Sequence, residues 1–379
     1  MQAVPGWNED VPGRTVRCSR TRFHMQPMRT SHVSKEFTRL TRACRGLLTA
    51  AVCVLATRCI AADPPTAFRI ATVAPKGSSF HTSLQAMGQR WKSAPGGGVG
   101  IDIYAQSQGG EPAIVRRMRI NQLQGAMLTA VGMSQIDKSV TALQMMPMMF
   151  RSWEEVDLVR EKLRPKLEKT FLDKGFVVLF WGDAGWVRWF SKTPITRPAD
   201  LKPLKVYASS GDPESIEIMK DYYQPVVLEP DKIFSSLSTD MINAIPIPAF
   251  LGNALQVSSL AGNMLDLKWV PVVGAMVITK SAWDKLPEET RNALKADGEK
   301  TGIEIRTNSR NEDNTAITVM QEKQKLKVQT LTPAIEDEWF RELEKTHPKV
   351  RGPVVPTDFF DEVVAILKQH RAGKAGSAK

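Results

Sequence analysis

Apolar positions in residues 66–370 fall into two kinds of pattern that follow each other along the chain. Short apolar runs bounded by turn residues predict strands at 67–74, 99–105, 125–131, 176–181, 204–208 and 272–279. Apolar residues at helical spacing predict helices at 79–92, 112–121, 152–174, 213–221, 287–325 and 357–370. Because strands and helices alternate, the pattern predicts an α/β fold built in layers.

This alternating part is too long for one hydrophobic core, since domains divide beyond roughly 250–300 residues. We predict two lobes, with lobe I from 66–185 plus about 272–310 and lobe II from 186–271 plus about 311–370. The boundary near Gly185 follows a change to shorter strands with proline-rich connections. A chain that crosses between lobes more than once favours a hinge. For residues 371–379, which are rich in alanine, glycine and lysine, we predict a disordered tail.

The formal charge of +11 is concentrated at the N-terminus. Residues 1–62 contain ten basic and three acidic residues, so they carry +7, and residues 63–379 carry +4. Because no block of five or more Lys or Arg residues follows residue 62, we expect no nucleic-acid partner. All four cysteines precede residue 62, which excludes a disulfide, a thiolate metal site and a cysteine nucleophile from the rest of the chain.

The N-terminal segment predicts an export signal. A basic stretch ending at Arg45 precedes the apolar run 46–57, and small residues suited to signal peptidase end at Ala62. Since a membrane span needs about 20 apolar residues, we predict a cleaved leader over 1–62 and a periplasmic protein without stable membrane insertion. This leader is longer than usual, so translation starts at either Met1 or Met28. Alternatively, the apolar run forms a short buried helix.

Signatures of catalysis and of metal binding are missing from residues 63–379. Segment 132–136 lacks the second glycine of a nucleophile elbow, and the glycine-rich turn 96–100 leads into a strand pattern instead of a helix. His81, His347 and His370 are far apart and lack the spacing of a zinc site. We therefore expect no enzymatic activity, no metal and no cofactor.

Several segments, in this order and spacing, resemble the periplasmic solute-binding proteins of TRAP transporters, the DctP-like family, over nearly all of residues 66–345. They are FRIATVAPKGSS (68–79), GGGVGIDIY (96–104), QGGE (108–111), RINQLQGAM (119–127), PMMFRSWEE (147–155), ITRPADLKPLKVY (195–207) and ITKSAWDKLPEE (278–289). The resemblance implies a two-lobed periplasmic-binding-protein fold with an interlobe ligand cleft and a long helix in the C-terminal half. It also implies two partners, a small organic ligand and the membrane subunits of a TRAP permease.

The resemblance places a charged ligand group near two positions. Tyr207 takes the place of the arginine with which the family usually fixes a ligand carboxylate, and Arg188 matches a second family arginine upstream. A phenol offers a neutral hydrogen bond of about 1 kcal/mol, whereas a charge-assisted arginine–carboxylate contact is worth roughly 1.5–3 kcal/mol. Arg188 is therefore our candidate for an anionic ligand group. Alternatively, it is a structural arginine stacked on Trp186 or Trp189.

Two other positions implied by the resemblance have become apolar. Ile247 stands where a ligand-contacting asparagine is common, and Val131 stands where some carboxylate-binding members have a glutamate. Together with Tyr207, these changes point to a less polar ligand. Gln108 and Glu111 lie at a strand–helix turn that faces the same cleft in the family, or they form a solvated turn.

Large apolar side chains are frequent around these positions. Trp186, Trp189 and Phe250 are candidates to cover the ligand, whereas most residues of this kind, including Trp181 and the methionines of 145–149, are expected to form core. The sequence thus predicts capture of an organic acid with a hydrophobic body and its delivery to a TRAP-type permease. Two alternatives stay open: an uncharged, lipid-like ligand, or a ligand-sensing module without a transport role.

Overall fold

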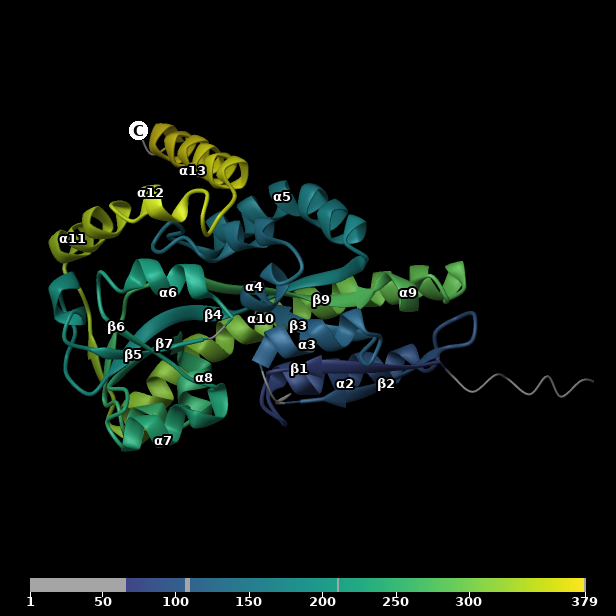
Figure 1. Cartoon of the computed structure of the whole chain (residues 1–379), viewed down its shortest axis with the longest axis horizontal. Helices are drawn as coiled ribbons and strands as arrows, with labels where there is room; N and C mark the ends of the chain where they lie inside the picture. The colour runs from purple at the N-terminus through teal and green to yellow at the C-terminus, as the bar shows by residue number, and fades with distance from the viewer. Residues whose placement is uncertain (1–65, 106–109, 210, 378–379) are drawn as a thin grey trace, which may run out of the picture. The chain divides into compact units, whose positions relative to one another are not determined.

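The computed structural model describes residues 66–105, 110–209 and 211–377. The predicted leader over 1–62 lies outside these residues. Within them, ten strands form one mixed sheet with the order β2-β1-β3-β9-β4-β7-β5-β6, and β8 joins β4 to β10 (Figure 1). The strands are β1 (Thr66–Thr72), β2 (Val99–Tyr104), β3 (Gly125–Thr129), β4 (Phe176–Ser191), β5 (Lys205–Ala208), β6 (Gln224–Val227), β7 (Ala244–Pro248), β8 (Asn263–Leu265), β9 (Pro271–Thr279) and β10 (Lys327–Gln329).

Helices pack around this sheet, which confirms the predicted α/β fold. The α-helices are α2 (Ser79–Trp91), α3 (Gly110–Arg119), α4 (Ala130–Ser134), α5 (Trp153–Asp173), α6 (Pro213–Met219), α7 (Ile233–Ser238), α8 (Ala249–Ala254), α9 (Lys280–Trp283), α10 (Glu288–Gln324), α11 (Pro333–Glu344), α12 (His347–Val350) and α13 (Thr357–Ser377). Short 3-10 helices are η1 (Lys138–Leu143), η2 (Pro198–Leu201), η3 (Pro230–Lys232) and η4 (Val257–Ser259).

Strand β4 joins the two halves of the sheet and is much longer than the predicted strand 176–181. Its residues 176–186 pair with β9, and residues 187–191 pair with β7 and β8. Parallel strands β1, β2 and β3 lie on the β9 side, and parallel strands β5, β6 and β7 lie on the other. The change of partner follows Gly185, where we predict the first crossing between lobes. The lobe limits themselves stay a prediction.

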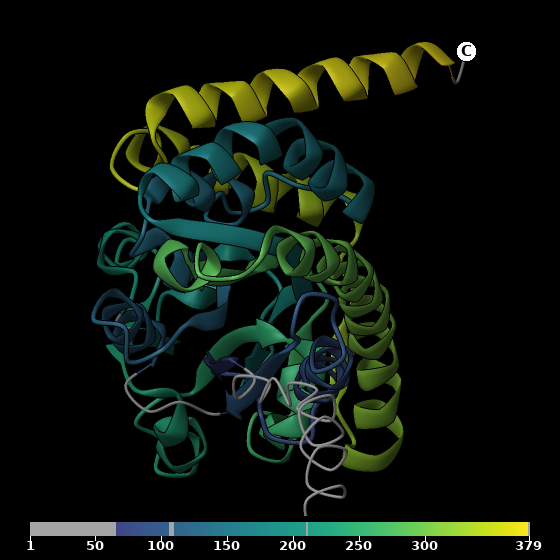
Figure 2. The same cartoon turned by 90° about the vertical axis from the view of Figure 1, so that its right-hand side faces the viewer.

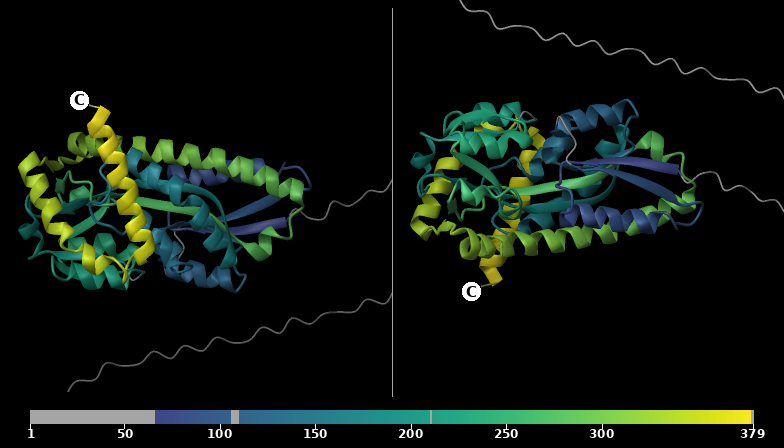
Figure 3. Two further views of the ribbon diagram at one scale, coloured as in Figure 1. Left: turned by 90° about the horizontal axis from the view of Figure 1, so that it is seen from above. Right: turned by 90° about the horizontal axis from the view of Figure 1, so that it is seen from below.

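Helices α5 and α10 cover opposite faces of β4. Val178 and Trp181 belong to the core cluster that includes α5, whereas Leu179 and Phe180 belong to the cluster that includes α10. Helix α10 begins beside α2, where Asp297 accepts a hydrogen bond from Arg90, and ends beside α8 (Figure 3). It therefore contacts both halves of the sheet. Among the described residues, no helix has both the length and the apolar character needed to cross a membrane.

The C-terminal helix α13 extends to Ser377, so most of the tail that we predicted to be disordered is helical. It packs on α5, as Figure 2 shows. The physical reason lies at Arg371, whose guanidinium donates to both carboxylate oxygens of Glu155 at 2.8 Å and to the Met149 carbonyl at 2.7 Å. Composition alone did not indicate these contacts, because they join residues far apart in the chain.

Replacing Arg371 with alanine is expected to lower the free energy of unfolding by about 1.5–3 kcal/mol at pH 7, since it removes charged hydrogen bonds from a buried carboxylate. Burial raises the pKa of the Glu155 carboxyl, but Arg371 and the Arg151 backbone N–H together hold that pKa below its usual value. The stabilisation should therefore be lost as the pH falls through this lowered pKa. Urea unfolding of both proteins at a series of pH values measures the difference.

Lys374→Ala is the matched control on the same helix. Lys374 pairs with Glu154, and both side chains are more than half exposed, so little change in stability is expected. An Arg371 variant that unfolds like this control would contradict the proposed anchoring.

Candidate functional site

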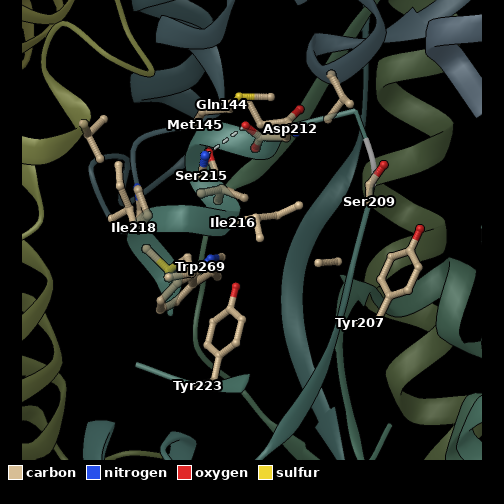
Figure 4. Close-up of a pocket in the computed structure, with 16 residues that line it drawn as sticks. Gln144, Met145, Tyr207, Ser209, Asp212, Ser215, Ile216, Ile218, Tyr223 and Trp269 are labelled. Atoms are coloured by element: carbon tan, nitrogen blue, oxygen red, sulfur yellow. Dashed lines mark hydrogen bonds between the residues drawn. The ribbon is translucent and has the colours of Figure 1, made fainter. Parts of the chain in front are cut away.

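A cavity of about 170 Å³ lies where the carboxyl ends of β3 and β5 face each other (Figure 4). From one side it is lined by Val131, in the short helix that follows β3. From the other side it is lined by Tyr207 of β5, by Ser209, and by Asp212 at the start of α6. Its size is close to that of an apolar protein cavity of about 150 Å³ that binds benzene. The cavity can therefore hold a small organic molecule.

Glu111 fixes the chain on the β3 side of this cavity by binding the residues around Val131. Its carboxylate accepts hydrogen bonds from the Thr129 N–H at 2.5 Å, the Thr129 hydroxyl at 2.6 Å and the Gly132 N–H at 3.0 Å. These bonds turn the chain from β3 into α4 and so present Val131 to the cavity. Burial raises the pKa of Glu111, although the same hydrogen bonds act in the opposite direction. Glu111 is thus neither a solvated turn residue nor part of the lining.

Tyr207 and Asp212 supply polar atoms on the β5 side. Burial, together with the nearby Glu229 and Glu111 carboxylates, raises the pKa of Tyr207 to about 12, so the phenol is neutral at pH 7. The Asp212 carboxylate caps α6 by accepting from the Ser215 N–H at 3.2 Å. Burial also raises the pKa of Asp212. This side therefore presents a neutral phenol, two serines (Ser209 and Ser215) and one acid.

The two sides of the cavity are joined at their edge. The Gln135 side chain donates to the Gly211 carbonyl at 3.1 Å, and the Lys138 ammonium lies 2.6 Å from a Glu214 carboxylate oxygen. Gly211 packs so closely that a Cβ at this position would lie 2.6 Å from a methyl group of Val131. These contacts hold the chain after β5 against α3 and α4.

Aromatic rings form the floor of the cavity. Tyr223 and Trp269 both line it, and Figure 4 shows the Tyr223 hydroxyl pointing toward its centre. Trp189 lies behind them, fully buried, with its ring edge-on to Tyr223 at 5.5 Å and to Trp269 at 5.1 Å. The Trp189 indole N–H has no hydrogen-bond partner among the described residues. Trp189 thus supports the lining without contributing to it.

Arg188 does not line the cavity. Arg188 is 4% exposed. Its guanidinium lies 2.6 Å from a carboxylate oxygen of Asp313, which is also buried, and 3.0 Å from one of Asp266. Asp313 additionally accepts hydrogen bonds from the backbone N–H groups of Ala249 and Trp186. The arginine is therefore held by two carboxylates where β4, α8 and α10 meet.

Three other predicted site residues pack away from the cavity. Trp186 packs on Trp153 at 4.8 Å, Ile247 is buried opposite Arg188 on β7, and Phe250 packs on Phe80 at 5.6 Å. None of these three lines the cavity. Gln108 lies outside the described residues. Of the nine predicted residues, the structure brings Tyr207 and Val131 together at the cavity.

Sequence reasoning missed several of the lining residues, including Gln144, Asp212, Ile216, Tyr223 and Trp269. One signal could have found Asp212, because ligands of open α/β sheets bind beyond the carboxyl ends of strands, and Asp212 follows β5 closely. The predicted methionine cluster contributes Met145, which lines this cavity.

A second cavity, of about 430 Å³, shares Met145 and Asp212 with the first. It is also lined by Arg116 of α3 and by Lys138. Lys138 is paired with Glu214, as described above, whereas Arg116 is exposed. The charged lining of the two cavities therefore differs. Arg116 and Lys138 line the second together with the acids Asp212 and Glu214, whereas the described lining of the first contains Asp212 but no lysine or arginine.

Comparisons with known proteins agree with this architecture. A solute-binding protein of Roseobacter denitrificans is 22% identical over 236 residues, which cover 60% of this chain and 70% of that protein. A TRAP periplasmic solute-binding protein of Shewanella oneidensis with bound succinate superposes with a TM-score of 0.73 at 16% identity, and one of Ralstonia eutropha with bound (S)-2-acetolactate with 0.74 at 18%. A Bordetella pertussis solute receptor that binds pyroglutamic acid gives 0.72 at 17%. Each superposition covers 80% of this chain and 99% of the other.

The family comparison extends over most of the chain. Residues 70–351 match the family described as bacterial extracellular solute-binding protein, family 7. The matched region contains the sheet from within strand β1 onward and every residue that lines the first cavity. The chain therefore belongs to the bacterial extracellular solute-binding proteins of family 7.

Proposed function

We propose that this protein captures a small organic solute outside the cytoplasm and delivers it to a TRAP-type permease. The observation that carries the proposal is the cavity itself, which is built from the carboxyl ends of β3 and β5 and so takes side chains from both halves of the sheet. A ligand held by both halves stabilises the conformation in which they meet, and capture needs only this difference in affinity. Family membership and the TRAP proteins of similar structure support delivery to a permease.

The next point is whether the ligand is an organic acid. The sequence predicts an organic acid with a hydrophobic body, held at Arg188, and the ligands of the Shewanella, Ralstonia and Bordetella proteins are acids. Asp313 and Asp266 already pair with the Arg188 guanidinium, so a ligand carboxylate there would compete with two carboxylates. An acid held by Arg188 stays a prediction, and the geometry of the first cavity does not favour it.

Cavity size bears on the lipid-like alternative. A volume of about 170 Å³ is suited to a molecule near the size of benzene and is too small for a long acyl chain. A small ligand is therefore the better supported choice. No contact in the described residues favours a sensor module over a transport protein.

Ile216→Trp tests whether the first cavity is the binding site. Ile216 lines the cavity from α6, so a tryptophan would fill much of the space that a ligand needs. In a thermal-shift screen of small organic acids, amines, alcohols and amides, a ligand should raise the melting temperature of the natural protein. We expect the melting temperature of the variant not to rise with the ligand, because the variant should bind it at least tenfold more weakly.

Ile303→Trp is the matched control, because Ile303 is exposed on α10, away from the cavity. This variant should respond to the ligand like the natural protein. If the screen finds a ligand and both variants still bind it equally, the cavity is not the site. If no small solute stabilises the natural protein, solute capture itself is wrong.

A further inference from the structure

The first cavity combines aromatic rings with a carboxylate. Tyr207, Tyr223 and Trp269 line it together with Asp212, whereas no lysine or arginine does so in the described part of the chain. The Asp212 carboxylate accepts hydrogen bonds from Ser215, and no lysine or arginine among the described residues donates to it. A carboxylate can accept about four hydrogen bonds, so oxygen lone pairs remain for a ligand.

Charges around the cavity also favour a positive ligand. The Glu111 and Glu229 carboxylates both raise the pKa of Tyr207, so they act on this phenol as negative charges although neither lines the cavity. Lys138, which acts on Asp212 as a positive charge, is already paired with Glu214. Opposite charges a few ångströms apart attract strongly where water is excluded, and like charges repel.

We propose that the first cavity selects a small cationic amine, whose ammonium group donates to Asp212 while its apolar body lies against Tyr207, Tyr223 and Trp269. Aromatic faces attract cations through the negative charge of the ring surface, and an ammonium group supplies the donors that a carboxylate accepts. A carboxylate ligand would instead meet the like charge of Asp212. The inference rests on the proposed function and names the class of solute that the protein captures.

Matched compounds that share one apolar body separate charge from shape. Cyclopentylamine is a cation at pH 7, cyclopentanol is neutral, and cyclopentanecarboxylate is an anion. Isobutylamine, isobutanol and isovalerate form a second set. In isothermal titration and thermal-shift measurements on the natural protein, each amine should bind at least tenfold more tightly than its alcohol, and the carboxylates should bind most weakly.

Asp212→Asn removes the charge and keeps the shape, and asparagine caps a helix as well as aspartate does, so α6 should be preserved. This variant should bind the amines at least tenfold more weakly. Asp231→Asn, at an exposed carboxylate that lines neither cavity, should leave amine affinity unchanged. Tyr207→Arg places a cation in the cavity and should reverse the order, with carboxylates bound more tightly than amines.

Three results would overturn the inference while leaving solute capture intact. One is preferential binding of a carboxylate by the natural protein, above all if Arg116→Ala abolishes it, since this would place the ligand's charge at the second cavity. Another is equal affinity for amine and alcohol. If neither set binds but the wider screen finds another solute, the cationic assignment is also wrong and the proposed function stands.

Discussion

Replacing Asp313 with alanine is expected to lower the free energy of unfolding by about 3–5 kcal/mol, because it leaves a buried guanidinium without its closest partner. The Asp313 carboxylate is 2% exposed and lies 2.6 Å from the Arg188 guanidinium. It also accepts from the Ala249 N–H at 2.7 Å and from the Phe250 and Trp186 N–H groups at 3.3 Å. Alanine would leave all of these donors buried without this acceptor.

The second carboxylate on the same arginine provides the control. The Asp266 side chain is 42% exposed and lies 3.0 Å from Arg188. Because water can replace this carboxylate, Asp266→Ala should change stability by no more than about 1 kcal/mol. Urea unfolding of the three proteins under one set of conditions measures both effects. Equal losses in the two variants would contradict the central role of Asp313.

This comparison also decides between two roles for Arg188. If Arg188 mainly holds β4, α8 and α10 together, Arg188→Ala should reduce stability strongly and ligand affinity only indirectly. If it mainly holds a ligand carboxylate, the same variant should lose affinity while its stability changes less than that of Asp313→Ala. The ion pair with a buried aspartate makes us expect the first outcome.

Local features of the fold could be predicted from sequence because their causes are local. The helix predicted at 152–174 begins where Ser152 caps it, with the Ser152 hydroxyl accepting from the Glu155 N–H. The long helix predicted at 287–325 is observed as α10 within a residue at each end. Both depend on spacing and capping within one segment.

Features that depend on distant partners could not be predicted. Arg188 meets Asp313 across 125 positions of sequence, and Arg371 meets Glu155 across 216. A pattern of apolar spacing contains no information about such pairs. The resemblance correctly indicated the family and predicted that Tyr207 and Val131 belong to one site. It could not show that Arg188 already forms ion pairs with two carboxylates.

The aromatic candidates show the same limit. Trp181 is buried, as expected for a core residue, but Trp186 and Trp189, which we predicted to cover the ligand, are buried as well and do not line the first cavity. Which tryptophan reaches the cavity depends on how sheet and loops pack, and the residue that does so is Trp269, which no motif indicated. Topology would have been the better guide, because the lining follows the ends of strands β3 and β5.

Gly274→Ala is expected to lower the free energy of unfolding by about 3 kcal/mol, at the upper end of the range for overpacking. A Cβ at Gly274 would lie 2.4 Å from the Leu128 carbonyl oxygen and 3.2 Å from its carbon, and backbone atoms cannot rotate away as a side chain can. Strand β9 is paired with β3 on one side and β4 on the other, so a shift breaks one of the two ladders.

The damage should reach the ligand site, because the neighbouring Val273 N–H donates to the side chain of Gln144, which lines the first cavity. Gly100→Ala, in edge strand β2, is the matched control, since its nearest contact would be 3.9 Å away. That variant should change stability by no more than about 0.5 kcal/mol. Urea unfolding and ligand titration of both variants test the argument, and equal stability of the two would show that β3 and β9 can separate without loss.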